Sequence, residues 1–514
     1  MIWLTHHILT ILILFPMAGA ALFLLIPPDK KTVVRWTALI ISAVEFLLSV
    51  SLFFHFDAQA VFQFVQEIRW IPEWGISYSV GVDGISLFLV FLTTFLGPVA
   101  ILSSWRSIAT GVKAFMTSLL VMEAAMVGVF VSTDLFFFYV FWEAVLIPMY
   151  FIIGVWGSGR KIYSAIKFVL FTMVGSLLML VGIVYLYVQT KTQLGTPSLS
   201  YGAVTELILS KDVQIYLFMA FALSFAIKVP LFPFHTWLPD AHTDAPTAGS
   251  IILAGVLLKM GGYGLLRFSV PLFPLAVPYF VPLIIALSVT GIVYGALMAM
   301  IQPDMKRLVA FSSVSHLGFV VLGIFVLTDK SVTGSIIHMV NHGLSTGALF
   351  LLVGMLYDRR HTRMINDFGG LARSLPGYTV AFIIVSLASL GLPGLNGFVG
   401  EFLILAGSFG SHPVAVALAT VGVILAAVYL LWLVERVFFG GLEKEENRHL
   451  TDMTKREWAA VVPIIVVIVW LGVYPGPVLE KIEPSVDALI NRYKLASGHN
   501  DHPEDVWVWD GEDR

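Results

Sequence analysis

The stretch Phe225-Ala226-Ile227-Lys228-Val229-Pro230-Leu231-Phe232-Pro233 decides the fold class. It places a lysine and two prolines inside an apolar run from about residue 213 to 237, which is long enough to cross a bilayer. An ammonium group at that depth is costly and is kept only beside a partner or a water-filled path. Because proline lacks a backbone donor and clashes with the preceding turn, the helix is expected to break there. The run therefore predicts a discontinuous membrane helix beside a functional site.

The composition excludes a soluble fold. The 514 residues are 58% hydrophobic and only 12% charged, whereas ordinary soluble domains carry about 25% charged residues. The mean hydropathy is +0.89. The absence of cysteine excludes disulfides, thiol catalysis, thiolate metal sites and cysteine-ligated iron-sulfur clusters. No GxxxxGK[ST], GxGxxG or GxSxG motif occurs, so no nucleotide, dinucleotide or serine-hydrolase site is expected.

Long apolar runs predict an all-α polytopic membrane protein with about 14 transmembrane helices. The predicted spans lie near residues 7–26, 33–54, 84–104, 113–132, 135–156, 164–188, 213–237, 248–270, 279–301, 308–328, 333–357, 377–409, 413–437 and 458–476. The long twelfth run could be one broken span or two short pieces. The cation distribution between the spans favours one broken span.

Lysine and arginine are distributed unequally between alternate loops. One side carries 19 of the 30 cations and the other side carries 9. The positive-inside rule places the 19-cation side in the cytoplasm, so both termini are expected on the outer side. Only Lys228 and Lys259 belong to neither side, because both lie inside apolar helices.

Four carboxylates, Glu45, Glu123, Glu143 and Glu401, are also surrounded by membrane sequence. Buried carboxylates together with two amines are what a proton relay needs, because burial and pairing bring proton affinities toward the working pH. Static ion pairs are the alternative. We favour the relay for Lys228, Lys259 and Glu143, whereas for Glu45 and Glu123 pairing with a neighbouring helix or subunit is an equal alternative.

Three of the 13 histidines, His316, His338 and His342, lie in predicted spans beside other polar residues and are candidates for the site. His338 and His342 are four residues apart and share a helical face, as a zinc pair does, but no third ligand or HExxH pattern supports a metal. Beside serine and asparagine, His316 and His342 suit hydrated relay positions, with satisfied structural histidines as the alternative. His235 and His242 flank Pro239 and are expected to make capping or loop contacts.

A second break is expected in the run 377–409, where glycines and Pro393 precede Glu401. Interrupted helices in corresponding halves indicate an inverted-repeat transporter, although either break alone could be an incidental kink. The separation of Pro230 and Pro393, 163 residues, suits inverted repeats of five helices. The predicted regions are residues 1–112 (helices 1–3), 113–270 (first repeat), 271–440 (second repeat) and 441–514 (the last helix and an acidic tail).

Several motifs together resemble the antiporter-like subunits of respiratory complex I over about residues 70 to 440. They are Phe141-Trp142-Glu143-Ala144-Val145-Leu146-Ile147-Pro148-Met149-Tyr150, Lys228-Val229-Pro230, His235-Thr236-Trp237-Leu238-Pro239-Asp240-Ala241-His242, Ala245-Pro246-Thr247-Ala248-Gly249-Ser250, Ser313-Val314-Ser315-His316-Leu317-Gly318 and Asn341-His342-Gly343-Leu344-Ser345. The chain is similar to the M branch, because it has Glu401 where the L and N branches usually carry lysine. It also lacks room for the lateral helix of the L branch.

The resemblance implies that Glu143 and Lys228 form a switching pair, Lys259 the central relay, and Glu401 the terminal residue nearest an adjoining subunit. His316 and His342 would be hydrated connectors. It further implies a proton-pumping subunit of NADH:quinone oxidoreductase in a bacterial inner membrane, between L-type and N-type partners. The chain itself would hold no cofactor, since FMN, iron-sulfur clusters and quinone would be bound by other subunits.

Three alternatives remain open. A subunit of a multi-subunit cation/proton antiporter uses the same scaffold, and so does a relative of membrane-bound hydrogenases. A structural subunit that does not pump would leave Lys228, Lys259, Glu143 and Glu401 without a reason to lie in lipid.

Overall fold

Long apolar helices make up most of the chain in the computed structural model, which describes residues 2–59 and 61–498. Twelve helical segments of that part are long and apolar enough to cross a membrane. The predicted class, an α-helical polytopic membrane protein with an antiporter-like fold, is confirmed. The count of 14, the inverted repeats and the four-part division stay predictions. The end of the acidic tail lies outside the described residues.

The N-terminal half contains two strands and the helices that precede the first break. These elements are α1 (Ile2–Leu22), η1 (Phe23–Leu25), α2 (Lys31–His55), β1 (Gln63–Ile71), η2 (Pro72–Trp74), β2 (Ile76–Val82), α3 (Leu87–Ser107), α4 (Val112–Val131), α5 (Leu135–Ala144), α6 (Leu146–Trp156), α7 (Lys161–Leu194), α8 (Tyr201–Thr205) and α9 (Lys211–Lys228).

The C-terminal half contains the helices that follow the first break. They are α10 (Trp237–Asp244), α11 (Thr247–Ile252), η3 (Leu253–Leu257), α12 (Leu258–Gly264), η4 (Leu265–Ser269), α13 (Val270–Leu272), α14 (Val277–Met300), α15 (Met305–Val326), α16 (Asp329–Arg360), η5 (Ile365–Asp367), η6 (Leu371–Arg373), α17 (Pro376–Ser389), α18 (Asn396–Phe409), α19 (Pro413–Phe438), α20 (Glu445–Arg448), α21 (Lys455–Val473) and α22 (Gly476–Ser497).

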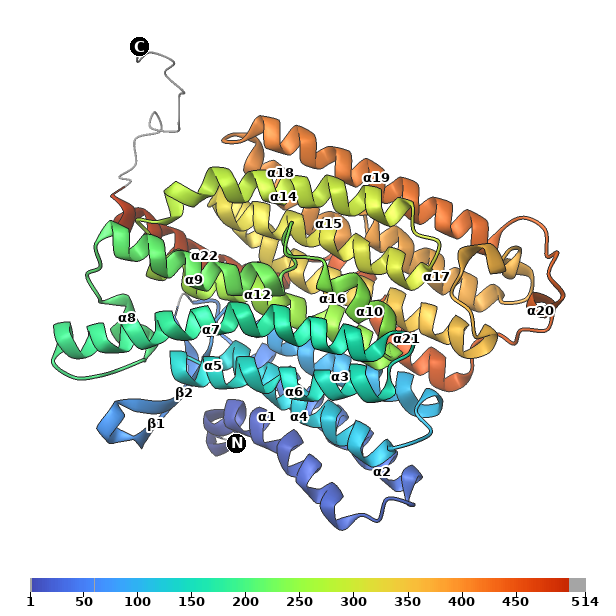
Figure 1. Cartoon of the computed structure of the whole chain (residues 1–514), viewed down its shortest axis with the longest axis horizontal. Helices are drawn as coiled ribbons and strands as arrows, with labels where there is room; N and C mark the ends of the chain where they lie inside the picture. The colour runs from blue at the N-terminus through green and yellow to red at the C-terminus, as the bar shows by residue number, and fades with distance from the viewer. Residues whose placement is uncertain (1, 60, 499–514) are drawn as a thin grey trace.

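The helices run side by side along the long axis of the molecule (Figure 1). The blue N-terminal helices lie at one edge of the bundle, and the orange helix α19 lies at the opposite edge. Helices α15 and α16 occupy the interior, since the membrane-length windows of both are buried over their whole length. By contrast, only a third of the α2 window is buried. Two of the predicted site residues, His316 on α15 and His342 on α16, therefore lie on helices in the interior of the bundle.

Both predicted breaks are confirmed. Helix α9 ends at Lys228, and the chain does not become helical again until Trp237. Helices α17 and α18 are separated between Ser389 and Asn396. Proline and glycine explain each break, because proline removes a backbone donor and glycine tolerates left-handed conformations, as at Gly391 with a φ of 81°.

A β-hairpin and a C-terminal helix are additions that the sequence analysis did not predict. Strands β1 and β2 pair antiparallel beside the N-terminal helices. Helix α22 packs against α16. Both segments are amphipathic rather than uniformly apolar, so a search for long apolar runs passes over them.

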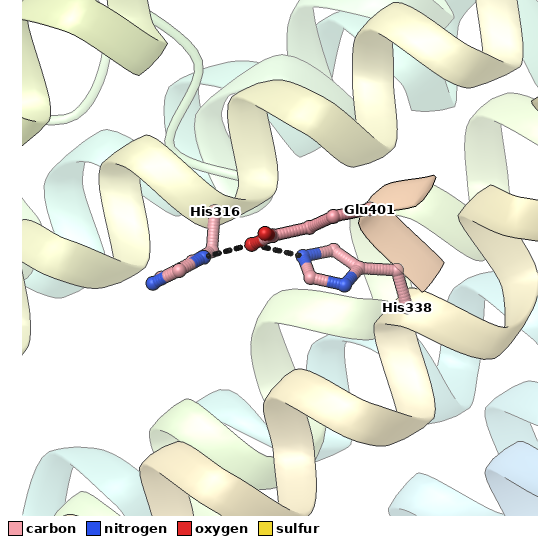
Figure 2. A group of neighbouring side chains, drawn as sticks. All are labelled: His316, His338 and Glu401. Atoms are coloured by element: carbon pink, nitrogen blue, oxygen red, sulfur yellow. Dashed lines mark hydrogen bonds and ion pairs between the residues drawn. The ribbon is translucent and has the colours of Figure 1, made fainter. Parts of the chain in front are cut away.

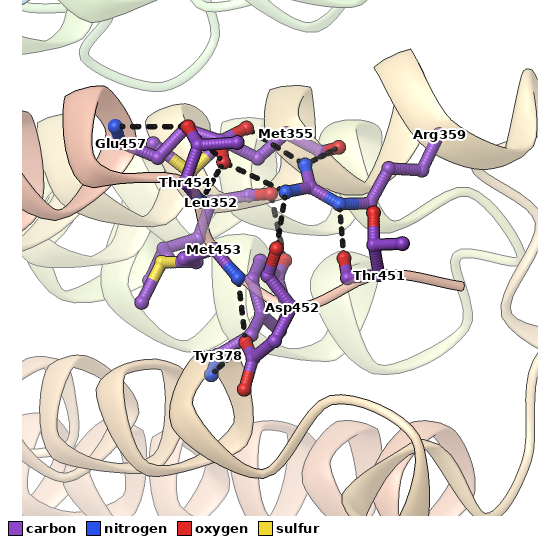
Figure 3. A network of polar contacts seen from close by, with 9 residues as sticks. All are labelled: Leu352, Met355, Arg359, Tyr378, Thr451, Asp452, Met453, Thr454 and Glu457. Carbon is purple, nitrogen blue, oxygen red and sulfur yellow. Dashed lines mark hydrogen bonds and ion pairs between the residues drawn. The ribbon is translucent and has the colours of Figure 1, made fainter.

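A polar network holds the start of α21 against the end of α16 (Figure 3). Arg359 donates to both carboxylate oxygens of Glu457, over 2.8 and 2.7 Å. Thr454 and Glu457 form a capping box at the start of α21. Bidentate guanidinium–carboxylate pairs combine strength with fixed geometry, so this network sets the position of α21.

Candidate functional site

Five of the six predicted site residues lie on five helices that contact one another in succession across the bundle, and the sixth, Glu143, lies on α5. Helix α9 packs against α12, α12 against α16, α16 against α15, and α15 against α18. Each of these helices contributes a buried ionisable side chain. They are Lys228, Lys259, His342, His316 and Glu401, and each is at most 5% exposed.

Lys259 lies between two π-helical turns, η3 and η4. A π-turn leaves backbone carbonyls without their usual helical donors and is often found at functional sites. The Nζ atom of Lys259 donates a short hydrogen bond to the carbonyl oxygen of Ala254 in η3. Its second partner is Nδ1 of His342, at 2.7 Å. The ammonium therefore contacts a backbone carbonyl and an imidazole, and neither of these partners is a carboxylate.

The buried ionisable residues form a row that continues beyond Lys259 with His342, His316, His338 and Glu401. The rings of His342 and His316 are 5.7 Å apart between centroids. Nδ1 of His316 is 2.9 Å from Oε1 of Glu401, and Figure 2 shows both side chains pointing toward each other. Nε2 of His338 is 3.9 Å from the same oxygen. The structure thus brings four predicted residues, Lys259, His342, His316 and Glu401, into one chain of neighbours.

Glu143 and Lys228 lie at the other end of this arrangement. The ammonium of Lys228 lies 4.7 Å from the ring centroid of Trp142 and has no hydrogen-bond partner among the described residues. Glu143 is within electrostatic range of Lys228, but no ion pair within 4.0 Å joins them in the part of the chain that the structure describes. Tyr139, one helical turn before Glu143, lies next to its carboxylate. The ammonium of Lys228 therefore packs against the ring of Trp142, near the carboxylate of Glu143 but not in an ion pair with it.

The sequence analysis missed three features of the site. Trp142 and the Ala254 carbonyl carry no charge, so a search for ionisable groups passes over them. His338 was considered only as half of a zinc pair. The structure also corrects the expectation for His242: its side chain makes no capping contact and is fully buried against Phe350, with ring centroids 4.8 Å apart. The packing of α10 against α7 and α15 encloses it.

Three side chains have the composition of a metal site. The ligand atoms of His316, His338 and Glu401 all lie within 4.8 Å of one another, and this group includes only one member of the His338–His342 pair considered from the sequence. A tetrahedral zinc ion would keep its ligand atoms about 3.3 Å apart. The 2.9 Å contact of His316 with Glu401 is shorter than that and suits a hydrogen bond. That the chain binds no metal stays a prediction.

Glu45 and Glu123 form a second, smaller group on α2 and α4. Both are buried, and Glu45 is within electrostatic range of Glu123. The hydroxyl of Ser42 lies 2.9 and 3.0 Å from the two oxygens of Glu123. The hydroxyl of Ser42 on α2 thus links Glu123 on α4 to the neighbouring helix, whereas neither carboxylate oxygen of Glu45 has a hydrogen-bond partner among the described residues.

Comparison with known proteins gives a consistent result. A model of the family described as "NADH:quinone oxidoreductase/Mrp antiporter, TM" matches residues 132–426. NADH-quinone oxidoreductase subunit M of Rhodobacter capsulatus is 46% identical over 505 residues, covering 96% of this chain and 98% of the relative. The chain belongs to this NADH:quinone oxidoreductase/Mrp antiporter family.

Other members of the NADH:quinone oxidoreductase/Mrp antiporter family are similar in sequence and fold. NADH-ubiquinone oxidoreductase chain 4 of Marchantia polymorpha is 45% identical, covering 94% of this chain and 97% of the relative. A chain of respiratory complex I from Thermus thermophilus with bound NADH is 32% identical, with a TM-score of 0.86, covering 94% of this chain and 99% of that one. A chain of the Mrp complex from Dietzia sp. DQ12-45-1b, 19% identical with a TM-score of 0.80, shares the fold; 95% of this chain and 99% of that chain are covered.

Proposed function

We propose that this chain is the proton-translocating M-type membrane subunit of an NADH:quinone oxidoreductase. The observation that carries the proposal is the buried row from Lys259 through His342 and His316 to Glu401, with Lys228 and Glu143 beyond it. Two of its steps are hydrogen-bond distances, 2.7 Å from Lys259 to His342 and 2.9 Å from His316 to Glu401, and the ring centroids of His342 and His316 between them are 5.7 Å apart. Names of relatives that are 40–46% identical over most of the chain support the same assignment.

In the proposed mechanism, quinone reduction in other subunits changes the separation of Glu143 and Lys228. A carboxylate near an ammonium group favours the charged form, so moving the two apart lowers the proton affinity of Lys228. The proton then passes toward Lys259, and from there through the imidazoles of His342 and His316 to Glu401. Imidazole suits the connecting positions because one ring nitrogen can accept a proton while the other releases one.

The chain's own residues supply the proton path, and the redox groups are proposed to belong to other subunits. The FMN, iron-sulfur clusters and quinone of the complex would be bound there, which agrees with the absence of cysteine from this chain. L-type and N-type antiporter-like subunits are proposed to lie on either side of it. The proposed location is the bacterial inner membrane.

The subunit composition of the purified complex tests this function. We expect an affinity tag on this chain to recover flavin and iron-sulfur subunits, identified by mass spectrometry and by absorbance. The competing assignments are a cation/proton antiporter and a membrane-bound hydrogenase relative. Recovery of antiporter subunits only, or of hydrogenase-type subunits, would replace the proposed function with the corresponding alternative.

The charge bias predicts the orientation of the chain. A reporter fused after residue 514 should be active only outside the cytoplasm, and a reporter inserted near residue 447 only inside. The measurement is paired alkaline phosphatase and green fluorescent protein fusions at each site. Since the two sites are separated by one predicted span, reporters on the same side would contradict the predicted topology.

A further inference from the structure

A cavity of about 500 Å³ lies at the cation-rich end of the bundle, among α3, α6, α15, α16 and α21. This volume falls within the range of about 300–1,000 Å³ that is typical of small-molecule sites. None of the relay residues lines it. Its ionisable lining residues are Arg106, Lys306, Asp358, Arg359, His361, Arg363, Arg456 and Glu457.

The positive charge of this lining exceeds its negative charge, because two acids face five lysine and arginine side chains. The carboxylate of Glu457 is already paired, since both of its oxygens accept hydrogen bonds from Arg359 (Figure 3). Arg363 is paired outside the cavity lining with Asp304, at 3.2 Å. Lys306 donates to the carbonyl oxygen of Ala245.

Arg106 and Arg456 are the two cations that remain. Within the described residues neither has an ion-pair or hydrogen-bond partner in this structure. The Nη1 atom of Arg456 is buried without any partner. Such a donor is rare in folded proteins and calls for a ligand that satisfies it. Planar guanidinium groups match the oxygen geometry of phosphate, which they bind through two parallel hydrogen bonds.

The depth of the cavity suggests where the phosphate comes from. Trp156 lines it, and its Nε1 donates to the carbonyl oxygen of Thr110 in the loop between α3 and α4. Trp105 lies next to Arg106 in sequence and packs edge-on against Trp36. Tryptophan gathers at the level of lipid headgroups. We propose that Arg106 and Arg456 form a binding site for a phosphate group, supplied by the headgroup of an anionic phospholipid.

The test uses the intact complex, extracted in mild detergent and returned to vesicles of dioleoylphosphatidylglycerol. A photoreactive p-benzoylphenylalanine replaces Thr451, an exposed residue of the cavity lining. Irradiation should give a phosphatidylglycerol adduct on this chain, identified by mass spectrometry. In Arg106→Gln/Arg456→Gln the adduct should fall at least about tenfold, because two charge-assisted contacts are lost. The matched control is Lys30→Gln/Arg373→Gln, which removes the same charge from exposed residues outside the cavity, and it should retain the adduct.

A second arm measures the binding of radiolabelled inorganic phosphate to the delipidated complex. Phosphate binding that is lost in the cavity variant, without any lipid adduct, would support the site with free phosphate as its ligand. Equal adduct and equal phosphate binding in both double variants would overturn the proposal. A cross-link to a peptide of a neighbouring subunit would also overturn it, since the cavity would then be a protein interface. If the double variant fails to fold, Arg456→Lys replaces it in the test, because it keeps the positive charge. Its binding of phosphatidylglycerol should be weaker than that of the wild type and stronger than that expected of the double variant.

Discussion

A complex with Glu143→Gln should assemble at wild-type levels, yet lose proton pumping and most of its coupled quinone reduction. Glutamine keeps the shape of the side chain and removes the charge that favours protonated Lys228. Loss of one partner from a structural buried ion pair costs about 3–5 kcal/mol and would impair assembly. Here Glu143 is only partly buried and has no ion pair with Lys228, so assembly should survive.

The measurements are native-gel assembly, NADH–quinone turnover and acidification of membrane vesicles. Glu143→Asp should restore part of the activity, because it returns the charge with a shorter reach. Glu73→Gln, which neutralises an exposed glutamate between the strands β1 and β2, is the matched control. A Glu143→Gln complex that pumps at the wild-type rate would remove this residue from the relay.

Lys259→Met should abolish pumping while leaving the protein as stable as the wild type, or more so. Methionine has a similar length and is unbranched, so it fills the same space. Losing a group that transfers protons is expected to slow the process at least about 100-fold. The partners left behind, the Ala254 carbonyl and His342, are neutral, and so no unpaired charge remains. Replacing a buried charge with an apolar group is often neutral or stabilising by about 1–4 kcal/mol.

The two readouts separate a relay residue from a structural one. Pumping is measured in vesicles, and stability as the midpoint temperature at which the complex dissociates. Lys330→Met, at an exposed lysine near the start of α16, serves as the matched control and should change neither. A loss of stability that accompanies the loss of pumping would indicate that Lys259 holds the fold together instead.

The breaks in the helices could be predicted because their causes are local. Pro230 and Pro393 act on the backbone immediately around them, so the sequence places both interruptions correctly. The hairpin was not predictable from long apolar runs, since β1 has only nine residues and mixes polar with apolar side chains, most of them exposed. Its turn depends on Gly75, whose φ of 63° lies in the left-handed region that glycine tolerates best.

The burial of the candidate residues could be predicted better than their contacts with one another. A lysine at membrane depth is conspicuous in any sequence, and all six predicted residues proved to be half-buried or buried. The contact of Lys259 with His342, however, joins residues 83 positions apart and depends on how α12 packs against α16. The position of Trp142 over Lys228 likewise depends on the docking of α5 near α9, which no local signal encodes.

The proposed relay residues form a row that runs across the helices of the bundle and not along the helix axes. Its members sit on successive helices that run parallel to one another (Figure 1). In a bilayer, transfers between them are displacements within the membrane plane, at nearly constant depth. The transmembrane voltage does work only on charge that changes depth, about 2.3 kcal/mol per elementary charge per 100 mV. In the proposed mechanism, electrogenic steps are therefore confined to the entry of a proton into the row and its exit from it, and proton exchange among Lys228, Lys259 and Glu401 is expected to be nearly insensitive to voltage.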